Sequence, residues 1–324
     1  MRRTFKLLPL LIVASLTACN ANSYQESVLN CFDTYVNVKT KEVVINMHSR
    51  TCEIIKEIDA VSDAYRKRET TCIYDLNQTN EKLEVSFYLY DLLSKAVSLQ
   101  EAAPNFNLMI GSLSNKWKEA LEKEEVLSET LIQEELVKMN NSHLVLEKEN
   151  DKYYAQRVGE GLIDVGAIAK GYALDRCETY LHNYAGPNYD YIINAGNSSV
   201  LLGKNGGSST FTVKLKDLSK ETYLDLQECF VSTSGISEQK TVVNGVTYSH
   251  IIDPKTGSAT AQYDDVVVIN DNKEGNGALG DVLSTSLMMS SLEEIKETEK
   301  NMGINIIVIK DDKILYKSES IELH

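Results

Sequence analysis

From residue 142 onward the chain is dominated by short runs of apolar, mostly β-branched residues, a pattern that favours strands. The clearest runs are residues 191–195 (YIINA), 211–217 (FTVKLKD), 265–270 (DVVVIN) and 304–310 (INIIVIK). Two helical patterns interrupt this part of the chain, one after Ala169 and one around residues 281–290. No repeat or low-complexity tract is present, so we expect one α+β body over residues 31–324, with a mixed or antiparallel sheet and flanking helices.

The first half of the chain adds a strand pattern and several helical ones. Residues 35–44 (YVNVKTKEVV) alternate as a strand does. Apolar residues recur at helical spacing between Ile54 and Val61, and residues 85–100 form a second amphipathic pattern. Residues 118–139 are charged and have only a weak apolar face, which predicts a solvated helical excursion from the body.

Residues 1–19 (MRRTFKLLPLLIVASLTAC) are typical of a lipoprotein signal peptide, with cationic residues first, an apolar run next and a small residue before Cys19. The apolar run is too short for the ~20 residues of a membrane-spanning helix. An ordinary cleaved secretion signal or a buried first helix is the alternative. We expect removal of residues 1–18, lipidation of Cys19 and a polar tether over residues 19–30. The protein is then exported and lipid-anchored at the outer face of the cytoplasmic membrane.

The chain is acidic, with a formal net charge of −14 that becomes −17 once the three cationic residues of the leader are removed. This charge argues against a nucleic-acid partner. It does not exclude a phosphate-bearing ligand where lysines and a divalent cation offset the charge locally. The five cysteines beyond Cys19 show no CxxC or CxxH spacing, so zinc is not indicated. We expect most of them to be buried apolar fillers.

The stretch LIDVGAIAKGYALDRC (162–177) places a carboxylate, a tight glycine turn and a lysine within seven positions. We expect a strand over LIDV that ends at Gly166, and a helix from about Ala169. Backbone N–H groups and Lys170 then face an anion at the helix N-terminus. Lys170 can pair with a phosphate there, while Asp164 accepts hydrogen bonds from a ligand's hydroxyl or ring nitrogen. Packing and solubility are the alternative reasons for glycine and lysine in such a turn.

His250 lies in the stretch VSTSGISEQKTVVNGVTYSHIIDPKTG (231–257), after a hydroxyl-rich turn and three residues before Asp253. An imidazole has an ordinary pKa near ~6.5 and can take a proton from a hydroxyl at neutral pH. His250 is therefore a candidate general base.

A candidate metal site comes from the stretch GALGDVLSTSLMMS (277–290). Asp281 and Thr285 are four residues apart at the start of a predicted helix, and hence on one face of it. A carboxylate and a hydroxyl suit a hard cation such as Mg²⁺. Alternatively, Asp281 caps the helix and Thr285 is a surface residue.

These stretches resemble the signatures of the ApbE family of FAD-dependent, Mg²⁺-requiring protein FMN transferases. Residues 163–175 (IDVGAIAKGYALD) are similar to the first signature, D-x-G-[AG]-I-A-K-G-y-a-x-D. STSG…YSHIIDPKTG and DVLSTS resemble the second and third signatures, in the expected order. Weaker matches are FDTYVNV (32–38), IYDLNQ (73–78) and NFNLMIGSLSNKW (105–117). The resemblance covers most of residues 31–317 and implies an ApbE-like, T-fold-related structure.

The resemblance implies Mg²⁺-dependent transfer of FMN from FAD to a Ser or Thr hydroxyl of a target protein, with release of AMP. It makes His250 the base. The residues that it places at the Mg²⁺ are Ala167, Asp281 and Thr285, and those that it places at FAD are Asp164, Lys170, Phe32, Tyr65, Asn105, Phe106, Asn107, Ile251 and Ile252. The expected acceptor is an extracytoplasmic electron-transfer protein with a flavinylation motif of the D-G-A-T type, which is not found in this chain.

The chain departs from the family pattern in two loops. The N-x-G-G-[DN] turn reads NAGNSS (194–199), with Asn197 in place of a glycine and Ser198 in place of an acidic or amide residue. Asparagine tolerates positive φ, so the turn itself can persist. In the flavin loop, Pro104 replaces the usual glycine and Asn107 the usual aspartate.

Two other functions stay open at the level of the sequence. One is an FAD pyrophosphatase, in which water replaces the acceptor hydroxyl and FMN and AMP are released. The other is a flavin-binding lipoprotein without chemistry. The presence of a candidate base and a candidate metal set favours an enzyme over a carrier, because a carrier needs neither.

Overall fold

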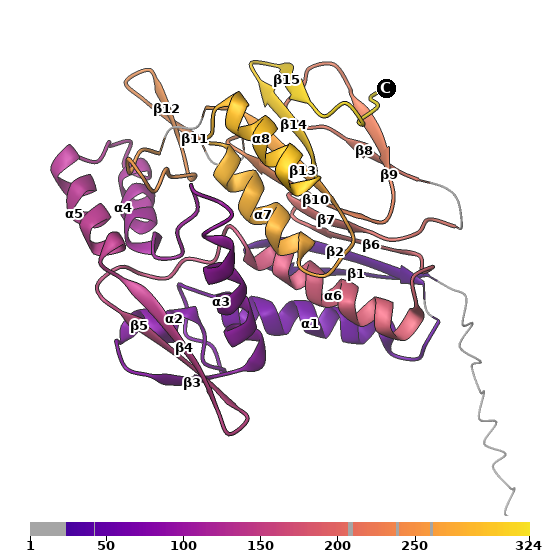
Figure 1. Ribbon diagram of the computed structural model, residues 1–324, viewed down its shortest axis with the longest axis horizontal. Helices are drawn as coiled ribbons and strands as arrows, with labels where there is room; N and C mark the ends of the chain where they lie inside the picture. Colours follow the sequence, from indigo (N-terminus) through magenta and orange to yellow (C-terminus); the bar gives the residue numbers. More distant parts are fainter. Residues whose placement is uncertain (1–23, 42, 207–209, 238–239, 260–261) are drawn as a thin grey trace, which may run out of the picture.

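An antiparallel sheet of eight strands forms the centre of the protein (Figure 1). The computed structural model describes residues 24–41, 43–206, 210–237, 240–259 and 262–324. In spatial order the strands are β1 (Tyr24–Cys31), β2 (Thr34–Lys41), β6 (Tyr191–Ala195), β7 (Ser199–Leu202), β10 (Cys229–Gly235), β13 (Asp265–Asp271), β14 (Asn305–Lys310) and β15 (Lys313–Lys317). Every neighbouring pair in this sheet is antiparallel. The α+β fold with an antiparallel sheet and flanking helices is confirmed.

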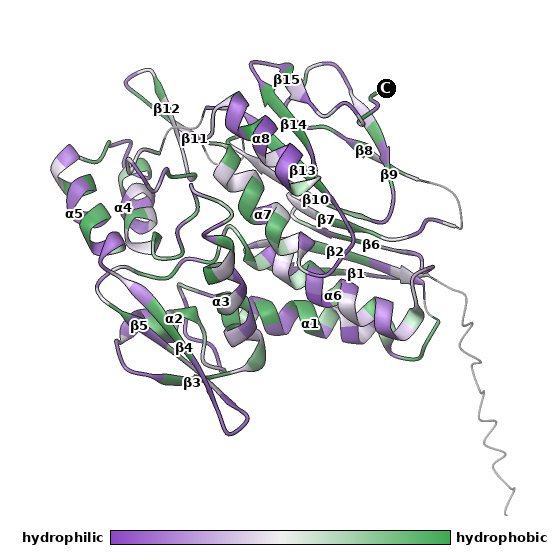
Figure 2. Cartoon of the chain, viewed as in Figure 1, coloured by the Kyte–Doolittle hydropathy of each residue, from purple (hydrophilic) through white to green (hydrophobic). Residues whose placement is uncertain are grey.

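Helices cover one face of the sheet and enclose the main core. They are α1 (Met47–Ser62), α6 (Ala169–Ala185), α7 (Asn276–Leu287) and α8 (Leu292–Met302). Strand alternation supplies the sheet side of this core, for example through Val266 and Val268 of β13. In Figure 2, α1 shows hydrophobic and hydrophilic segments in turn, as expected for a helix with one buried side.

A hairpin covers part of the opposite face of the sheet (Figure 1). It consists of β8 (Phe211–Lys214) and β9 (Tyr223–Leu226). Leu215 and Leu224 pack there with Val267 and Ile269 of β13, which alternate with the residues that face the helices. The sheet therefore separates two apolar layers.

The remaining elements lie beside the sheet (Figure 1). They are α2 (Ile73–Gln78), β3 (Leu83–Val85), α3 (Phe87–Leu99), α4 (Gly111–Leu121), α5 (Glu129–Asn140), β4 (His143–Glu149), β5 (Lys152–Val158), β11 (Lys240–Val243) and β12 (Val246–Ser249). Trp117 of α4 stacks on Tyr248 of β12, with 5.4 Å between ring centroids, and its Nε1 donates to the Gly257 carbonyl at 2.8 Å. These contacts hold the β11–β12 hairpin, and the loop that follows it, against α4.

Three predicted segments differ from the structure. LIDV is not a strand: Leu162 makes one isolated bridge with Ile110, and the Asp164 N–H donates to the Leu108 carbonyl of a loop. The helix placed around residues 281–290 is α7 and begins at Asn276. Residues 118–139 contribute to two helices, α4 and α5, with an apolar side against the core rather than a solvated excursion.

The N-terminal predictions are tested only in part. Residues 24–30, expected to belong to the tether, form most of β1 and pair with β2 along the whole strand. The leader and Cys19 lie outside the described residues. The five other cysteines are buried and form no disulfide, as expected of apolar fillers. In the described part of the chain, no helix is both long enough and apolar enough to span a bilayer.

Candidate functional site

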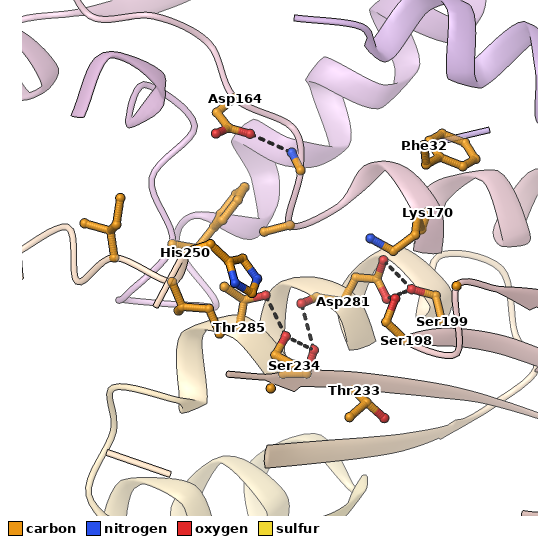
Figure 3. A pocket seen from close by; sticks show the side chains of 18 of the residues that line it. Phe32, Asp164, Lys170, Ser198, Ser199, Thr233, Ser234, His250, Asp281 and Thr285 are labelled. Carbon is orange, nitrogen blue, oxygen red and sulfur yellow. Dashed lines mark hydrogen bonds between the residues drawn. The ribbon is translucent and has the colours of Figure 1, made fainter. Parts of the chain in front are cut away.

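A cleft of about 360 Å³ opens at the end of the sheet where β6, β7 and β10 meet the N-terminal part of α6 (Figure 3). The predicted residues that line it are Phe32, Asn105, Phe106, Asn107, Asp164, Ala167, Lys170, His250, Ile251, Ile252, Asp281 and Thr285. Tyr65 is the exception. It lines an adjoining cavity of about 140 Å³, to which Phe32, Asp164 and Lys170 also contribute. The fold thus brings together segments that are more than 200 residues apart in the chain.

Asp281 is buried at the floor of the cleft and is held by three donors. Its Oδ1 accepts from Ser232 Oγ at 2.7 Å and from Ser199 Oγ at 2.8 Å, and its Oδ2 accepts from the Gly171 N–H at 2.6 Å. Burial raises the pKa of the Asp281 carboxyl, while the nearby Lys170 ammonium and the hydrogen-bond donors act in the opposite direction. Asp281 lies inside α7, so it is not the cap of that helix.

A close approach of two glycines brings α6 and α7 together beneath the cleft. A Cβ atom on Gly171 would lie 2.1 Å from the Gly277 carbonyl oxygen, and one on Gly277 would lie 2.5 Å from the Gly171 carbonyl oxygen. Only glycine permits this distance between the two backbones. Lys170 of α6 therefore lies near Asp281 of α7.

Asp175 caps α7 from the neighbouring helix. Its Oδ1 accepts from the N–H groups of Gly277 at 2.8 Å and Gly275 at 3.1 Å, and its Oδ2 accepts from Ala278 N–H at 2.8 Å. The side chain is buried, which raises the pKa of this carboxyl to about 7. Asp175 belongs to the quoted 163–175 signature, but sequence reasoning gave it no role. Its contacts satisfy the N-terminal N–H groups of the helix that carries Asp281.

We expect Asp175→Ala to destabilise the protein by about 2–4 kcal/mol, because a cap is lost and buried N–H groups are left without partners. The melting temperature should fall by roughly 5–10 °C in a chain of this size. Asp175→Asn retains one acceptor oxygen and should lose less. Equal melting temperatures for the Ala variant and the parent would contradict the capping role.

Hydroxyl groups of β10 connect the sheet to the second half of α7. Ser234 Oγ lies 2.9 Å from Thr285 Oγ1 and 2.9 Å from Ser284 Oγ. Thr285 is half-buried and is not a surface residue. The His250 imidazole, just after β12, points into the same cleft as Thr285 (Figure 3). The site thus has an imidazole and several hydroxyls along one wall.

Asp164 lies in a turn that a side chain of α2 holds in place. Asn77 bonds both backbone polar groups of the preceding residue: its Nδ2 donates to the Ile163 carbonyl at 2.9 Å, and its Oδ1 accepts from the Ile163 N–H at 2.8 Å. Asp164 Oδ1 accepts from the Gly166 N–H at 2.8 Å, which forms an Asx turn into α6. One carboxylate oxygen is engaged in this turn, and the side chain is half-buried at the cleft wall.

The two departures from the family pattern have structural counterparts. Asn197 has φ 55°, so the turn after β6 persists with asparagine in the left-handed region, as expected. Asn194 and Asn197 side chains brace this turn with two 2.8 Å hydrogen bonds. In the other loop, Asn107 Oδ1 accepts from the Met109 N–H at 2.9 Å, and Asn105 N–H donates to Ser286 Oγ at 3.1 Å. These amides shape the backbone beside the cleft.

Ser199 was missed by sequence reasoning, although it donates to both oxygens of Asp281. It follows the 194–198 turn as the first residue of β7. The only signal was strand alternation, which places Ser199 and Leu201 on the helix side and Val200 on the other.

Three residues that line the cleft carry the oxygens of the predicted metal set. Asp281 supplies a buried carboxylate, Thr285 a hydroxyl one turn later on the same helix, and Ala167 a carbonyl at the cleft wall. Such ligands suit a hard cation that keeps water or phosphate oxygens for its other positions. Within the described residues, no three His, Cys, Asp or Glu side chains cluster as a metal site. The predicted set contains only one such side chain, so it fits a cation shared with a ligand's phosphates.

The antiparallel α+β fold places a lysine, a buried carboxylate and an imidazole in one cleft. The ApbE family matches residues 32–308, which is most of the chain. The chain belongs to the ApbE family.

Curated relatives in this family are named FAD:protein FMN transferase. The protein of Haemophilus influenzae is 21% identical over 84% of this chain and 81% of its own length, and that of Klebsiella pneumoniae is 27% identical over 76% of each. The Rhodobacter capsulatus relative is 31% identical, but the match spans only 48% of this chain and 29% of the relative. 

Among solved structures, the ApbE protein of Thermotoga maritima superposes with a TM-score of 0.77, at 25% identity, over 92% of this chain and 98% of that one. The flavin transferase ApbE of Vibrio cholerae gives 0.72 at 20% identity, over 92% and 98%. The fold is therefore that of the ApbE proteins over nearly the whole chain.

Proposed function

We propose that this protein transfers FMN from FAD to a Ser or Thr hydroxyl of an exported or membrane target protein, in an Mg²⁺-dependent reaction that releases AMP. The observation that carries the proposal is the meeting of His250, Lys170 and Asp281 in one cleft. They come from three separate segments and supply a candidate base, a cation and a carboxylate. Such groups can supply proton transfer and charge stabilisation for transfer to phosphorus.

The class of activity is supported by the relatives. Each curated relative described above is named FAD:protein FMN transferase, and two of them are matched over three quarters or more of their length. Family membership and this shared name assign the chain to flavin transferase enzymes, with FAD as substrate and a protein as acceptor.

In the proposed reaction, the acceptor oxygen attacks the FMN-side phosphorus of FAD. A new P–O bond forms, the P–O bond to the bridging oxygen breaks, and AMP leaves. His250 takes the proton from the attacking hydroxyl, because its imidazole reaches into the cleft. Lys170 stabilises negative charge on the phosphate oxygens through the transition state. Asp164 and the residues near Phe32 and Asn105 position the flavin and adenine ends.

Ala167, Asp281 and Thr285 would hold Mg²⁺ through their oxygen donors. When bound, Mg²⁺ supplies charge neutralisation on the diphosphate oxygens. The protein's part is to hold the Asp281 carboxyl at this point through three hydrogen bonds. Burial raises the pKa of this carboxyl, and the Lys170 ammonium and the hydrogen-bond donors act in the opposite direction.

The proposal is tested by incubating the purified protein with FAD and Mg²⁺, with and without an acceptor domain that carries a D-G-A-T segment. Transfer predicts AMP together with an acceptor whose mass increases by that of a linked FMN. AMP and free FMN without acceptor labelling would instead identify an FAD pyrophosphatase. FAD binding without AMP release would identify a flavin-binding protein without chemistry.

The location is proposed from the leader sequence, with Cys19 as the lipidated residue at the outer face of the cytoplasmic membrane. We expect Cys19→Ala to leave the protein unlipidated, either unprocessed or released from the membrane, because the lipid is the expected anchor. Membrane and soluble fractions of cells that express the two forms decide this. If the variant stays with the membrane as the parent does, the assignment of the leader is wrong.

A further inference from the structure

Three consecutive aliphatic residues are exposed in the connection between β2 and α1. Val43 and Val44 are each 41% exposed, and Ile45 is 79% exposed. Single apolar residues scattered over a protein surface are normal, whereas an exposed run of three is expected only where it serves a function. Nowhere else in the part of the chain that the structure describes are three exposed large apolar residues consecutive. The 43–45 segment therefore has the character of a contact surface.

The fold presents this exposed segment from a fixed base. Before it, the Lys41 N–H donates to the Asp190 carbonyl at 3.0 Å, and the Tyr189 hydroxyl donates to the Lys41 carbonyl. After it, the Met47 N–H donates to the Val44 carbonyl at 3.2 Å, and the Met47 side chain is buried in the core. The chain is thus held to the body on both sides, while the aliphatic side chains between remain exposed.

Two exposed tyrosines lie at the same end of the molecule (Figure 1). Tyr24 begins β1 beside the end of β2, and its hydroxyl donates to Asp190 Oδ2 at 3.1 Å. Tyr184 lies near the end of α6, whose C-terminal half packs on the start of α1, where Cys177 Sγ donates to the Thr51 carbonyl at 3.8 Å. A tyrosine combines an apolar ring with a hydroxyl and suits a boundary between lipid and water.

The expected lipid on Cys19 lies within a short reach of this end. Because β1 begins at Tyr24, only four residues separate Cys19 from the folded body. A chain spans at most ~3.6 Å per residue, so Cys19 and Tyr24 are no more than roughly 18 Å apart. The lipid therefore keeps the Tyr24 end of β1 close to the bilayer, and the exposed aliphatic residues meet the bilayer at a high effective concentration.

We propose that the 43–45 segment, with Tyr24 and Tyr184 beside it, docks onto the lipid surface of the membrane and orients the anchored protein. This inference rests on the proposed lipid anchor at Cys19. The aliphatic side chains enter the boundary between headgroups and acyl chains, and the tyrosines lie at the level of the headgroups. The apolar area is small, so the segment orients a tethered protein but does not retain an untethered one.

Apolar contact rather than charge drives this docking. The cations at this end are paired: Lys41 lies 3.5 Å from the Asp190 carboxylate, and Arg50 of α1 lies 2.7 Å from the Glu57 carboxylate. The chain is also acidic overall, which opposes attraction to anionic lipids. Docking is therefore expected on neutral phosphatidylcholine and should change little with salt concentration.

Docking at this end holds the cleft away from the bilayer. β1 runs from Tyr24 to Cys31, and Phe32, the next residue, lines the cleft. A strand rises ~3.4 Å per residue, so the eight residues of β1 span roughly 27 Å. The docked protein thus offers its cleft to acceptor hydroxyls carried above the headgroups, up to about that distance, rather than to hydroxyls within the lipid boundary.

The test measures lipid contact in the full-length lipidated protein, reconstituted in phosphatidylcholine vesicles. Ile45→Trp places an indole in the exposed segment, and Trp117, the one tryptophan of the chain, is buried and gives a constant background. Lipids with brominated acyl chains should lower the emission of this variant about twofold, because a side chain ~5–10 Å into the headgroup and acyl boundary meets the bromine atoms. Val137→Trp, at an exposed position on α5, is the matched control and should stay unquenched.

A lipidated Ile45→Trp protein whose emission brominated lipids leave unchanged overturns the docking. Equal quenching of Val137→Trp does so as well, since the contact then has no preferred face. If the parent forms dimers that Ile45→Asp dissociates, a second copy of the chain covers the segment and the proposal fails. The mass of the N-terminal peptide reads the anchor separately: a protein without lipid on Cys19 contradicts the proposed location, and the docking falls with it.

Discussion

An Asp281→Ala variant is expected to lose Mg²⁺-dependent transfer by about 10³-fold or more, while its affinity for FAD falls by a smaller factor. The carboxylate is the only acidic side chain in the predicted metal set, and it faces Lys170 at the floor of the cleft. Contacts to the flavin and adenine come from other segments. Titrating the transfer rate against Mg²⁺ for both proteins measures the effect.

The matched control for this prediction is Ser232→Ala. It removes one hydrogen bond to Asp281 Oδ1 but leaves the carboxylate in place, so its rate should remain within about tenfold of the parent. Melting temperatures of both variants separate loss of chemistry from loss of fold. A folded Asp281→Ala protein with an unchanged Mg²⁺ requirement would falsify the metal role and leave Asp281 as a buried anchor between α6, α7 and the sheet.

Contiguous apolar runs made most of the fold predictable from the sequence. Residues 191–195 coincide with β6, and residues 265–270 and 304–310 coincide almost completely with β13 and β14. These strands are buried, so hydrophobicity alone marks them. LIDV failed as a strand for a different reason: it is apolar because it is buried, but its backbone bonds to the Leu108 carbonyl, to the Asn77 side chain of α2 and to the first residue of α4 rather than to a neighbouring strand.

The start of α7 could not be predicted from the residues around it. Its first residues, NGALG, contain two glycines, which disfavour a helix by about 1 kcal/mol each. The compensating contacts come from Asp175, about a hundred residues earlier, whose carboxylate caps the helix. This tertiary contact places Asp281 within the helix rather than at its cap.

The site itself was predictable in composition but not in arrangement. Lys170 and His250 belong to different signature motifs, and both line the same cleft, as the resemblance to the family implied. The hydroxyls around Asp281 depend on the side of β7 and β10 that each residue faces. Ser199 of β7 faces α7 and donates to Asp281, whereas Thr233 of β10 alternates with Ser232 and Ser234, which contact α7.

The choice between an enzyme and a flavin carrier depends on His250. If the imidazole is the general base, His250→Ala should keep FAD affinity close to that of the parent and slow transfer by about 10²–10⁴-fold. His182→Ala is the matched control, because His182 is an exposed imidazole on α6 outside the cleft.

The competing explanation is that His250 only supports the chain before Asp253. Asp253 begins a turn in which its carbonyl accepts from the Gly257 N–H at 2.8 Å and its carboxylate accepts from Thr256 Oγ1 at 2.8 Å. In that case His250→Ala lowers the melting temperature but leaves the activity of the folded protein intact. AMP release, acceptor labelling and melting temperature, measured on the same preparations, distinguish the two roles. A folded His250→Ala protein that labels the acceptor at the parent rate removes the imidazole from the mechanism, and the attacking hydroxyl must then lose its proton to another group in the cleft.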